Sequence, residues 1–147
     1  MSTKESLSKP SFWVKLTSLK NRFAKWFFSH TLTKKDVKKL IKNQINNKNS
    51  TITIPRRLRI FGIYKKITSI GNKAFEDNTN ITKVIIPDSV KSIGGYAFSK
   101  CSALTSVDIP NSVTSIRERV FDRCSALTSV DIPNRVSSDW MGGILWL

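Results

Sequence analysis

The sequence predicts an α/β solenoid, a short array of 23-residue coils with an α-helical cap at its N-terminus. The main observation is an eleven-residue string, Cys-Ser-Ala-Leu-Thr-Ser-Val-Asp-Ile-Pro-Asn, which begins at Cys101 and recurs unchanged from Cys124. The same offset of 23 residues also brings earlier apolar residues into register. A fixed period of this length is typical of a solenoid, because a single coil cannot bury its apolar face alone and stacks on its neighbours.

The residues that share this period are mainly apolar and would fill a continuous core. Aliphatic residues replace one another within a column, and one column is proline in three coils. The columns are Ile81, Leu104 and Leu127; Val84, Val107 and Val130; Ile86, Ile109 and Ile132; Pro87, Pro110 and Pro133; Val90, Val113 and Val136; Ile70, Ile93 and Ile116; and Phe75, Phe98 and Phe121. Stacked copies would place like residues over like, about 5 Å apart.

Composition and charge divide the chain into unlike halves. Only 39% of the residues are hydrophobic, which suits an array in which every coil repeats one thin slice of core. Residues 1–73 hold 18 Lys and Arg against 2 acidic residues, whereas residues 74–147 hold 7 against 8. We therefore expect the basic half to meet an anionic partner or surface separately from the repeats.

The sequence predicts three segments. Residues 1–50 form a basic, amphipathic helical extension or cap, and residues 51–136 form the solenoid. Residues 137–147 are apolar and out of pattern, since Asp139 and Ile144 stand where the isoleucine and phenylalanine columns would continue. This last segment is predicted to be either a C-terminal cap or a truncated repeat.

The N-terminal segment is predicted to begin with a helix that carries an aromatic stripe. The stripe residues recur at steps of three or four, which places them on one helix face; they are Phe12, Leu16, Leu19, Phe23 and Trp26. Three roles fit this pattern. The stripe closes the open end of the solenoid, as repeat arrays require, or lies in a membrane interface, or docks in a partner's groove or on nucleic acid.

A second helix is predicted to start after Thr33. Asp36 follows three residues later, and this capping-box spacing lets the two side chains satisfy free backbone N–H groups. The apolar face of the helix would be made by Val37, Leu40, Ile41 and Ile45. The run from Asn43 to Ser50 is rich in asparagine, which predicts a linker or a long turn.

β-Structure is expected to resume at Thr51–Pro55, where an Ile-Pro pair matches those of the later coils. The 23-residue register also predicts a degenerate first coil, in which Leu58, Phe61, Ile63 and Ile67 precede Ile81, Val84, Ile86 and Val90 by one period. Tyr64 then takes the place of the proline. A degenerate terminal coil is expected where one side faces something other than another coil.

Each full coil is expected to contain a short strand, a turn and a return. In Leu104–Ile109, strand alternation points Val107 and Ile109 inward and Asp108 outward. The Pro-Asn pair that follows suits a turn, because proline presets φ and asparagine tolerates the next turn position. A second extended piece is expected at Val113–Ile116, and a helical turn would insert the column phenylalanine into the core.

The coil pattern Leu-Thr-Ser-Val-x-Ile-Pro-x-x-Val-x-x-Ile-x-x-x-Ala-Phe-x-x-Cys resembles the BspA-type leucine-rich repeat. The resemblance covers Leu58 to Val136 and is specific, because the apolar columns, a proline and a phenylalanine recur in step. It implies a leucine-rich-repeat array without enzymatic activity that binds other proteins, in a family typically found at the cell surface or secreted. This chain departs from the pattern in having few coils and a basic helical N-terminus.

The N-terminus has no uninterrupted apolar run of the kind that a signal peptide needs, and no window is long enough to span a bilayer. We therefore expect no export signal and, by default, a cytoplasmic location. The family resemblance implies the cell surface as the alternative.

Two sets of residues are predicted to meet partners. Outward strand positions on neighbouring coils form the surface through which solenoids commonly bind proteins; they are Lys83, Ile85, Ser106, Asp108, Ser129 and Asp131. Basic residues near the first coil and on the second helix would bind an anionic partner; they are Arg56, Arg57, Arg59, Lys65, Lys66, Lys34, Lys35, Lys38 and Lys39. Asp108 above Asp131 would make a like-charge stack.

The sequence indicates no catalytic, cofactor or metal site. His30 is the sole histidine, and a serine or cysteine nucleophile needs an adjacent base. Cys101 and Cys124 are too few to hold zinc. Their spacing of one period would permit a disulfide, but we expect them to pack as reduced, small apolar side chains. Gly94-Gly95 lacks the lysine of a phosphate loop and predicts a turn with positive φ.

The sequence thus predicts a non-enzymatic protein–protein interaction module, with no indication of its partner or oligomeric state. Two alternatives stay open. One is a protein associated with nucleic acid or ribonucleoprotein through the basic residues 1–73. The other is a repeat protein attached peripherally to an anionic membrane through Phe12–Phe28.

Overall fold

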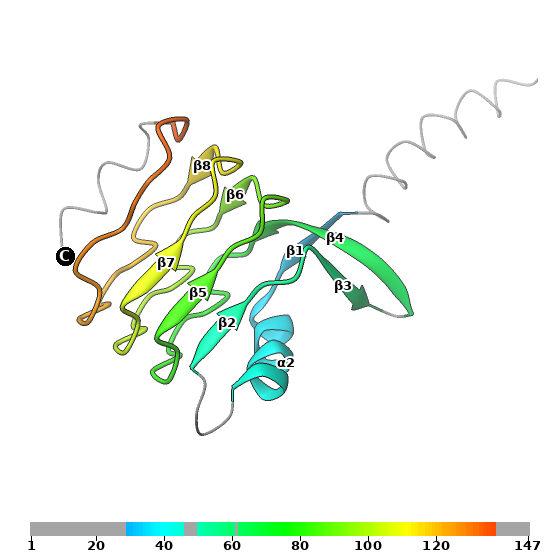
Figure 1. The fold of residues 1–147 in the computed structure, drawn as a ribbon, viewed down its shortest axis with the longest axis horizontal. Coiled ribbons are helices and arrows are strands. Elements are labelled where there is room, and N and C mark those ends of the chain that lie inside the picture. Colours follow the sequence, from blue (N-terminus) through cyan, green and yellow to red (C-terminus); the bar gives the residue numbers. More distant parts are fainter. Residues whose placement is uncertain (1–28, 46–49, 61, 138–147) are drawn as a thin grey trace, which may run out of the picture.

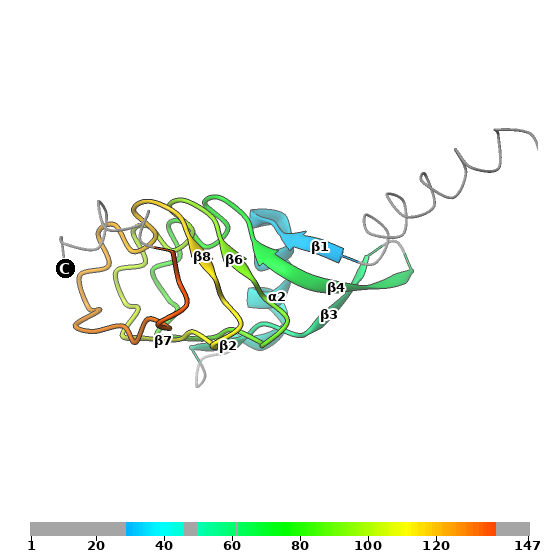
Figure 2. The ribbon, with the colours of Figure 1, turned by 90° about the horizontal axis from the view of Figure 1, so that it is seen from above.

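The structure is a computed structural model that describes residues 29–45, 50–60 and 62–137. The predicted first helix and the apolar segment after Ser137 lie outside the described residues. The described part is a stack of coils with one β-sheet on each of two faces, as Figures 1 and 2 show. Helix α2 (Lys34–Gln44) lies at the end of the stack where the chain enters it.

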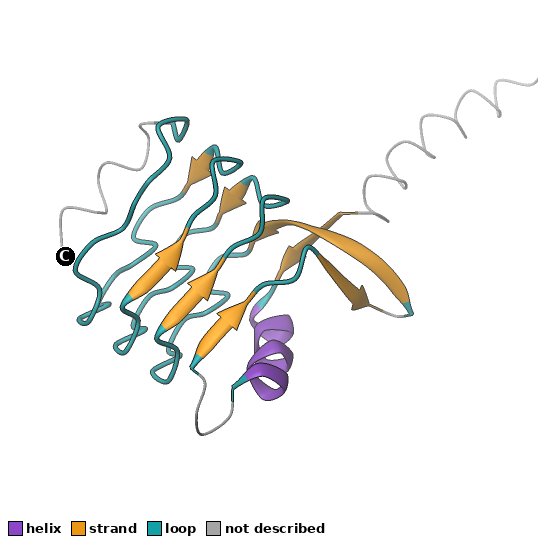
Figure 3. Cartoon of the chain, in the orientation of Figure 1, coloured by secondary structure: helices purple, strands orange, loops and turns teal. Residues whose placement is uncertain are grey.

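Both sheets run along the stack, and their strands are short except for β4 (Figure 3). The first sheet has the order β1 (Ser29–Leu32), β4 (Ile63–Ile70), β6 (Ser92–Ile93) and β8 (Ser115–Ile116), and β3 (Arg57–Ile60) pairs with β4. The second sheet has the order β2 (Thr51–Thr53), β5 (Lys83–Ile85) and β7 (Ser106–Asp108). Within the described residues, β3 and β4 form the antiparallel pair and the other pairs are parallel.

The pairing of strands confirms the predicted solenoid of 23-residue coils. Val84 of β5 pairs with Val107 of β7, and Ile93 of β6 pairs with Ile116 of β8, so each coil places its columns over those of the next. The column residues fill the core between the sheets, as predicted: most are buried, and the partly buried aliphatic ones are Ile109 and, in the last coil, Val130, Ile132 and Val136. Asp108 is exposed, as the strand alternation required.

The first coil is built differently from the prediction. Ile52 of β2 pairs with Val84 at an offset of 32 residues, in the place where the predicted register put Phe61. The nine extra residues lie between Pro55 and Ile67 and form the β3–β4 hairpin, which projects from the stack (Figure 1). Ile63 and Tyr64 are 37% and 62% exposed near its tip, so the alignment of Ile63 with the isoleucine column and of Tyr64 with the proline column is wrong.

The Ile54–Pro55 pair explains why β2, and not the hairpin, provides the strand of the first coil. Ile52 and Ile54 are both buried, and Pro55 sits directly after them, as Pro87 does after Ile86. Gly62 has φ of 82° and turns the chain between β3 and β4, where a residue with a Cβ would be strained. Register is regained from Ile67, which is fully buried, and Ile70, which pairs with Ile93.

Helix α2 begins as predicted at a capping box. The Thr33 side chain accepts a hydrogen bond from the Asp36 backbone N–H, and the Asp36 carboxylate accepts one from the Thr33 backbone N–H. Val37 and Leu40 are buried in the same core as the coils. The helix extends to Gln44, two residues into the predicted linker, and residues 46–49 lie outside the described part.

A strand that the sequence did not predict precedes this helix. β1 pairs in parallel with β4, and Leu32 of β1 is fully buried opposite Ile70. The His30 Nε2–H donates a hydrogen bond of 2.8 Å to the Asp36 carboxylate, which ties β1 to the first turn of α2. The segment from β1 to α2 is therefore part of the same core as the first coil.

The phenylalanine column is a stack of rings in the core. The ring centroids of Phe75 and Phe98 are 4.8 Å apart, and those of Phe98 and Phe121 are 5.6 Å apart. The segment that holds each ring is a turn. Its left-handed residues also recur with the period of the coil: Lys73, Tyr96 and Arg119, and then Asp77, Lys100 and Arg123.

Glycine serves a different purpose from the one predicted. The left-handed residue after the Gly94-Gly95 pair is Tyr96, and neither glycine has positive φ, so that prediction is wrong. Gly94 is required because a Cβ there would lie 2.6 Å from the backbone nitrogen of Asn72 in the preceding coil. The close approach of neighbouring coils therefore selects glycine at this position.

Candidate partner-binding surface

The outward side chains of β2, β5 and β7 form two rows across the second sheet. One row holds Thr51, Lys83 and Ser106, and the other holds Thr53, Ile85 and Asp108. The structure thus brings together four of the predicted partner-binding residues. It also adds two threonines, which the assumed 23-residue offset had left outside the rows.

An ion pair crosses from one row to the other. The Lys83 ammonium lies 3.0 Å from the Asp108 carboxylate, and the two side chains are 40% and 50% exposed. Such a pair contributes only about 0.2 to 1 kcal/mol of stability at an exposed site. Its main effect is to hold two charged groups beside the half-buried Ile85, so the face combines an apolar side chain with oriented charges.

The other two predicted residues do not lie on a strand. Ser129 and Asp131 are exposed, but the coil that contains them has no strand within the described residues. The inward neighbours Val130 and Ile132 are only partly buried against the core. Nothing in the described range stacks on the far side of this coil, which explains its looser packing. The like-charge stack of Asp108 and Asp131 stays a prediction, and the Asp108 carboxylate pairs with the Lys83 ammonium.

The opposite sheet carries a row of hydroxyl groups that the sequence analysis did not single out. Thr31, Ser69, Ser92 and Ser115 occupy one register position on four neighbouring strands. They lie along a groove of about 470 Å³ that ends near Arg117 and Glu118. The recurrence of Ser69, Ser92 and Ser115 at the repeat period was the sequence signal for this row.

The predicted anion-binding residues of the first coil lie mainly on the β3–β4 hairpin. Arg57 stands opposite Lys66, and Arg59 stands opposite Tyr64, so these four share one face. Arg57, Arg59 and Lys66 are exposed and form no ion pair with any described residue. Lys65 is half-buried on the other face, and Arg56 lies 3.0 Å from the Asp88 carboxylate.

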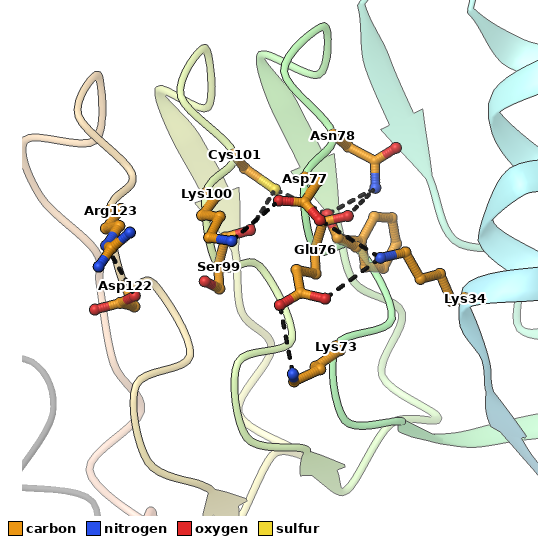
Figure 4. A network of polar contacts seen from close by, with 11 residues as sticks. Lys34, Lys73, Glu76, Asp77, Asn78, Ser99, Lys100, Cys101, Asp122 and Arg123 are labelled. Atoms are coloured by element: carbon orange, nitrogen blue, oxygen red, sulfur yellow. Dashed lines mark hydrogen bonds and ion pairs between the residues drawn. The ribbon is translucent and has the colours of Figure 1, made fainter.

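Among the lysines of α2 that were predicted to bind an anionic partner, Lys34 instead pairs with acidic residues of the same chain. Its ammonium lies 3.3 Å from a carboxylate oxygen of Glu76 and 3.7 Å from one of Asp77, as Figure 4 shows. Lys73 and Lys100 complete the network by pairing with Glu76 and Asp77 respectively. These contacts link α2 to the turns of two coils. The other predicted lysines of the helix, Lys35, Lys38 and Lys39, are exposed.

The two cysteines are free and buried, and each links two coils. The Cys101 thiol donates a hydrogen bond to the Phe75 carbonyl at 3.0 Å, and the Cys124 thiol donates one to the Phe98 carbonyl at 3.0 Å. Asn78, the equivalent residue one coil earlier, donates to the Phe75 carbonyl at 2.6 Å. Burial raises the pKa of Cys101 to about 12 and that of Cys124 to about 11, so both remain protonated thiols at neutral pH.

The described residues show no cluster of three or more His, Cys, Asp or Glu side chains that would hold a metal ion. Over the same ranges, every helix is too short or too polar to cross a bilayer. The membrane alternative rests on Phe12–Phe28, outside these ranges, and stays a prediction.

Stacked coils with parallel strands at a 23-residue period define a repeat protein of the leucine-rich-repeat class. Residues 55–139 match the family described as the BspA type leucine rich repeat region (6 copies), and the chain therefore belongs to this family. Leucine-rich-repeat proteins typically act as protein-interaction modules. No curated protein matches the sequence.

Two solved structures resemble the fold. A leucine-rich repeat protein of T. pallidum is 26% identical with a TM-score of 0.54, covering 62% of this chain and 41% of that protein. A leucine-rich repeat protein from Bacteroides ovatus is 31% identical with a TM-score of 0.57, covering 63% of this chain and 24% of that protein. The chain therefore spans less than half the length of either protein.

Proposed function

We propose that this chain binds a partner protein through the outward face of β2, β5 and β7. The observation that carries this proposal is the pair of in-register rows, in which the half-buried Ile85 lies beside the ion pair of Lys83 and Asp108. A surface that combines apolar area with oriented polar groups suits a protein partner. The face begins at β2, so Thr53 is part of it.

Helix α2 supports this role as the proposed cap of the array. Val37 and Leu40 cover the core of the first coil, which would otherwise face water at the end of the stack. Repeat arrays need such a terminal element for solubility. A rigid first coil would also present β2 to a partner without a further ordering penalty.

Photo-crosslinking tests the proposed face. A photoreactive residue is placed at Thr53 or at Asp108, and as controls at Lys35 on α2 or at Thr128 on the last coil; all four positions are exposed. We expect Thr53 and Asp108 to yield the same discrete crosslinked protein. Crosslinking only from the control positions would refute the assignment of this face, and equal crosslinking from all four would indicate nonspecific contact.

A second candidate function is the binding of an anionic polymer such as nucleic acid. It is favoured by the hairpin face, where Arg57, Arg59 and Lys66 surround the exposed Tyr64. Cations neutralise phosphates, and an aromatic ring offers a surface for base stacking. We expect Arg59→Gln to weaken such binding and Lys39→Gln on α2 to have less effect. Affinity that stays flat between about 50 and 200 mM salt would count against it.

A further inference from the structure

A cationic pocket lies where the inserted hairpin meets the turn that follows β5. Its volume is about 350 Å³, and it is lined by Arg56, Arg57 and Lys66 on one side and by Asp88 and Ser89 on the other. Because a water molecule occupies about 30 Å³ of liquid, the pocket has room for roughly ten waters or for a hydrated small ion. The lining holds three cations and one anion.

The arrangement of these charges leaves two cations without a counter-charge. Asp88 is committed to Arg56, whose guanidinium lies 3.0 Å from its carboxylate. Arg57 and Lys66 stand directly opposite each other on β3 and β4, and like charges in this relation are destabilising. No described acidic residue pairs with either of them. A bound anion between them would turn this repulsion into attraction.

A buried hydroxyl in the lining has no partner. Ser89 is 5% exposed, and its Oγ makes no hydrogen bond within the described residues. Leaving a buried polar group unpaired is unfavourable, and such groups are rare in folded proteins. Ser89 lines the pocket, and a serine hydroxyl reorients by rotation about the single χ1 bond.

In the next coil, the equivalent serine has a hydrogen-bond partner. Ser112, one period after Ser89, donates its hydroxyl to the Val90 carbonyl at 2.8 Å. The equivalent carbonyl for Ser89 belongs to Ile67, at the base of the inserted hairpin, and the corresponding hydrogen bond is not made. The hairpin thus supplies cations beside a serine hydroxyl that lacks the hydrogen bond made in the next coil.

We propose that this pocket binds a divalent oxyanion, phosphate or sulfate, either free or as the end group of a small molecule. Arg57 and Lys66 neutralise the charge, and Arg56, held in place by Asp88, and Ser89 donate hydrogen bonds. The site is separate from the β2–β5–β7 face and requires no protein partner, so it goes beyond the proposed function.

Calorimetric titration of the full chain with sodium phosphate, at ionic strength held constant with sodium chloride, tests the proposal. Sodium sulfate and phosphoserine serve as further arms. Saturable binding of phosphate or sulfate is expected, and tighter binding of phosphoserine than of free phosphate would identify an end group as the natural ligand. Heats that match the chloride blank in all arms would overturn the proposal.

Matched variants distinguish binding in this pocket from nonspecific attraction of the anion to the basic hairpin. Arg57→Gln and Lys66→Gln are each expected to weaken binding about tenfold or more, because each removes a charged hydrogen-bond donor. Arg59→Gln is the control, since Arg59 lies on the same face but outside the pocket lining. Equal losses for Arg57→Gln and Arg59→Gln would overturn the proposal.

The serine pair gives an independent control. Ser89→Ala is expected to weaken binding several-fold without lowering the melting temperature of the free protein, because the removed hydroxyl has no partner. Ser112→Ala is expected to lower the melting temperature and to leave binding unchanged. Unchanged phosphate affinity in Ser89→Ala would exclude the hydroxyl from the site and contradict the proposed geometry.

Discussion

Gln44 at the end of α2 forms two hydrogen bonds with the backbone of Thr53 in β2. The side-chain carbonyl accepts from the Thr53 N–H at 2.8 Å, and the side-chain amide donates to the Thr53 carbonyl at 2.9 Å. β2 lies at one edge of its sheet, and free edge groups invite pairing with another chain. Gln44 therefore supplies the contacts that a neighbouring strand would make, and it joins the helix to the first coil.

Replacing Gln44 should loosen this edge. Gln44→Ala removes both hydrogen bonds and is expected to lower the free energy of unfolding by about 1 to 2 kcal/mol. Gln44→Glu keeps an acceptor for the Thr53 N–H but has no donor for the carbonyl, so an intermediate loss is expected. Thermal unfolding monitored by circular dichroism measures both variants. Equal stability of all three proteins would show that the helix does not hold β2.

The loss of stability on replacing a stacked phenylalanine should depend on its position in the stack. Phe98 is fully buried between two rings, whereas Phe121 packs against one ring at the end of the described stack. Phe98→Ala is expected to destabilise the protein by about 3 to 5 kcal/mol, and Phe121→Ala by less. Urea unfolding gives both values. A larger loss at Phe121 would mean that the coils do not share one continuous core.

Asp36 should make stability depend on acid pH. Its burial alone would raise the pKa, but hydrogen bonds from His30 and Thr33 outweigh that effect and lower the pKa of Asp36 below its ordinary value. A lowered folded pKa adds stability above the unfolded value of about 3.9, and this stability is lost as pH falls through the folded pKa. The stability advantage over Asp36→Asn should therefore shrink below about pH 4. An advantage independent of pH between 5 and 2.5 would contradict this.

The thiols should be unreactive in the folded protein. Burial raises the pKa of both Cys101 and Cys124, and the thiolate is the reactive form. We expect a disulfide reagent such as DTNB to label neither residue at pH 7 until the protein is unfolded, when both should react. Rapid labelling of the native protein would show that the coils open at this position.

The periodic part of the fold was predictable from sequence because each column repeats one packing requirement. The offset of 23 residues identified the buried valines, isoleucines and phenylalanines, and the spacing of Thr33 and Asp36 identified the start of α2. The outward positions of β5 and β7 followed from strand alternation alone. At these positions, the residue type and the 23-residue period predicted the same structure.

The parts that break the period could not be predicted in the same way. The hairpin inserts nine residues between β2 and the next coil, beyond the 23-residue period. Leu58 and Ile63 are apolar and lie one period before core residues, so the sequence pattern assigned them to the core although they belong to the hairpin. β1 carries no repeat signal because it occurs once. The unpaired hydroxyl of Ser89 could not be predicted either. The equivalent Ser112 has the same residue type but donates to the Val90 carbonyl, and only the fold distinguishes the two serines.

The register of the first coil requires that β2 is its strand and that the β3–β4 hairpin is an insertion. Removing residues 58–66 leaves Pro-Arg-Arg-Ile, which matches Pro87-Asp-Ser-Val90 in length and restores the 23-residue period. We expect this variant to unfold cooperatively, with amide hydrogens of β2 and β5 protected from exchange as in the full chain. Ile52→Ala should in contrast cost about 2 to 5 kcal/mol. Loss of protection across the coils in the deletion variant, with Ile52→Ala tolerated, would contradict this register.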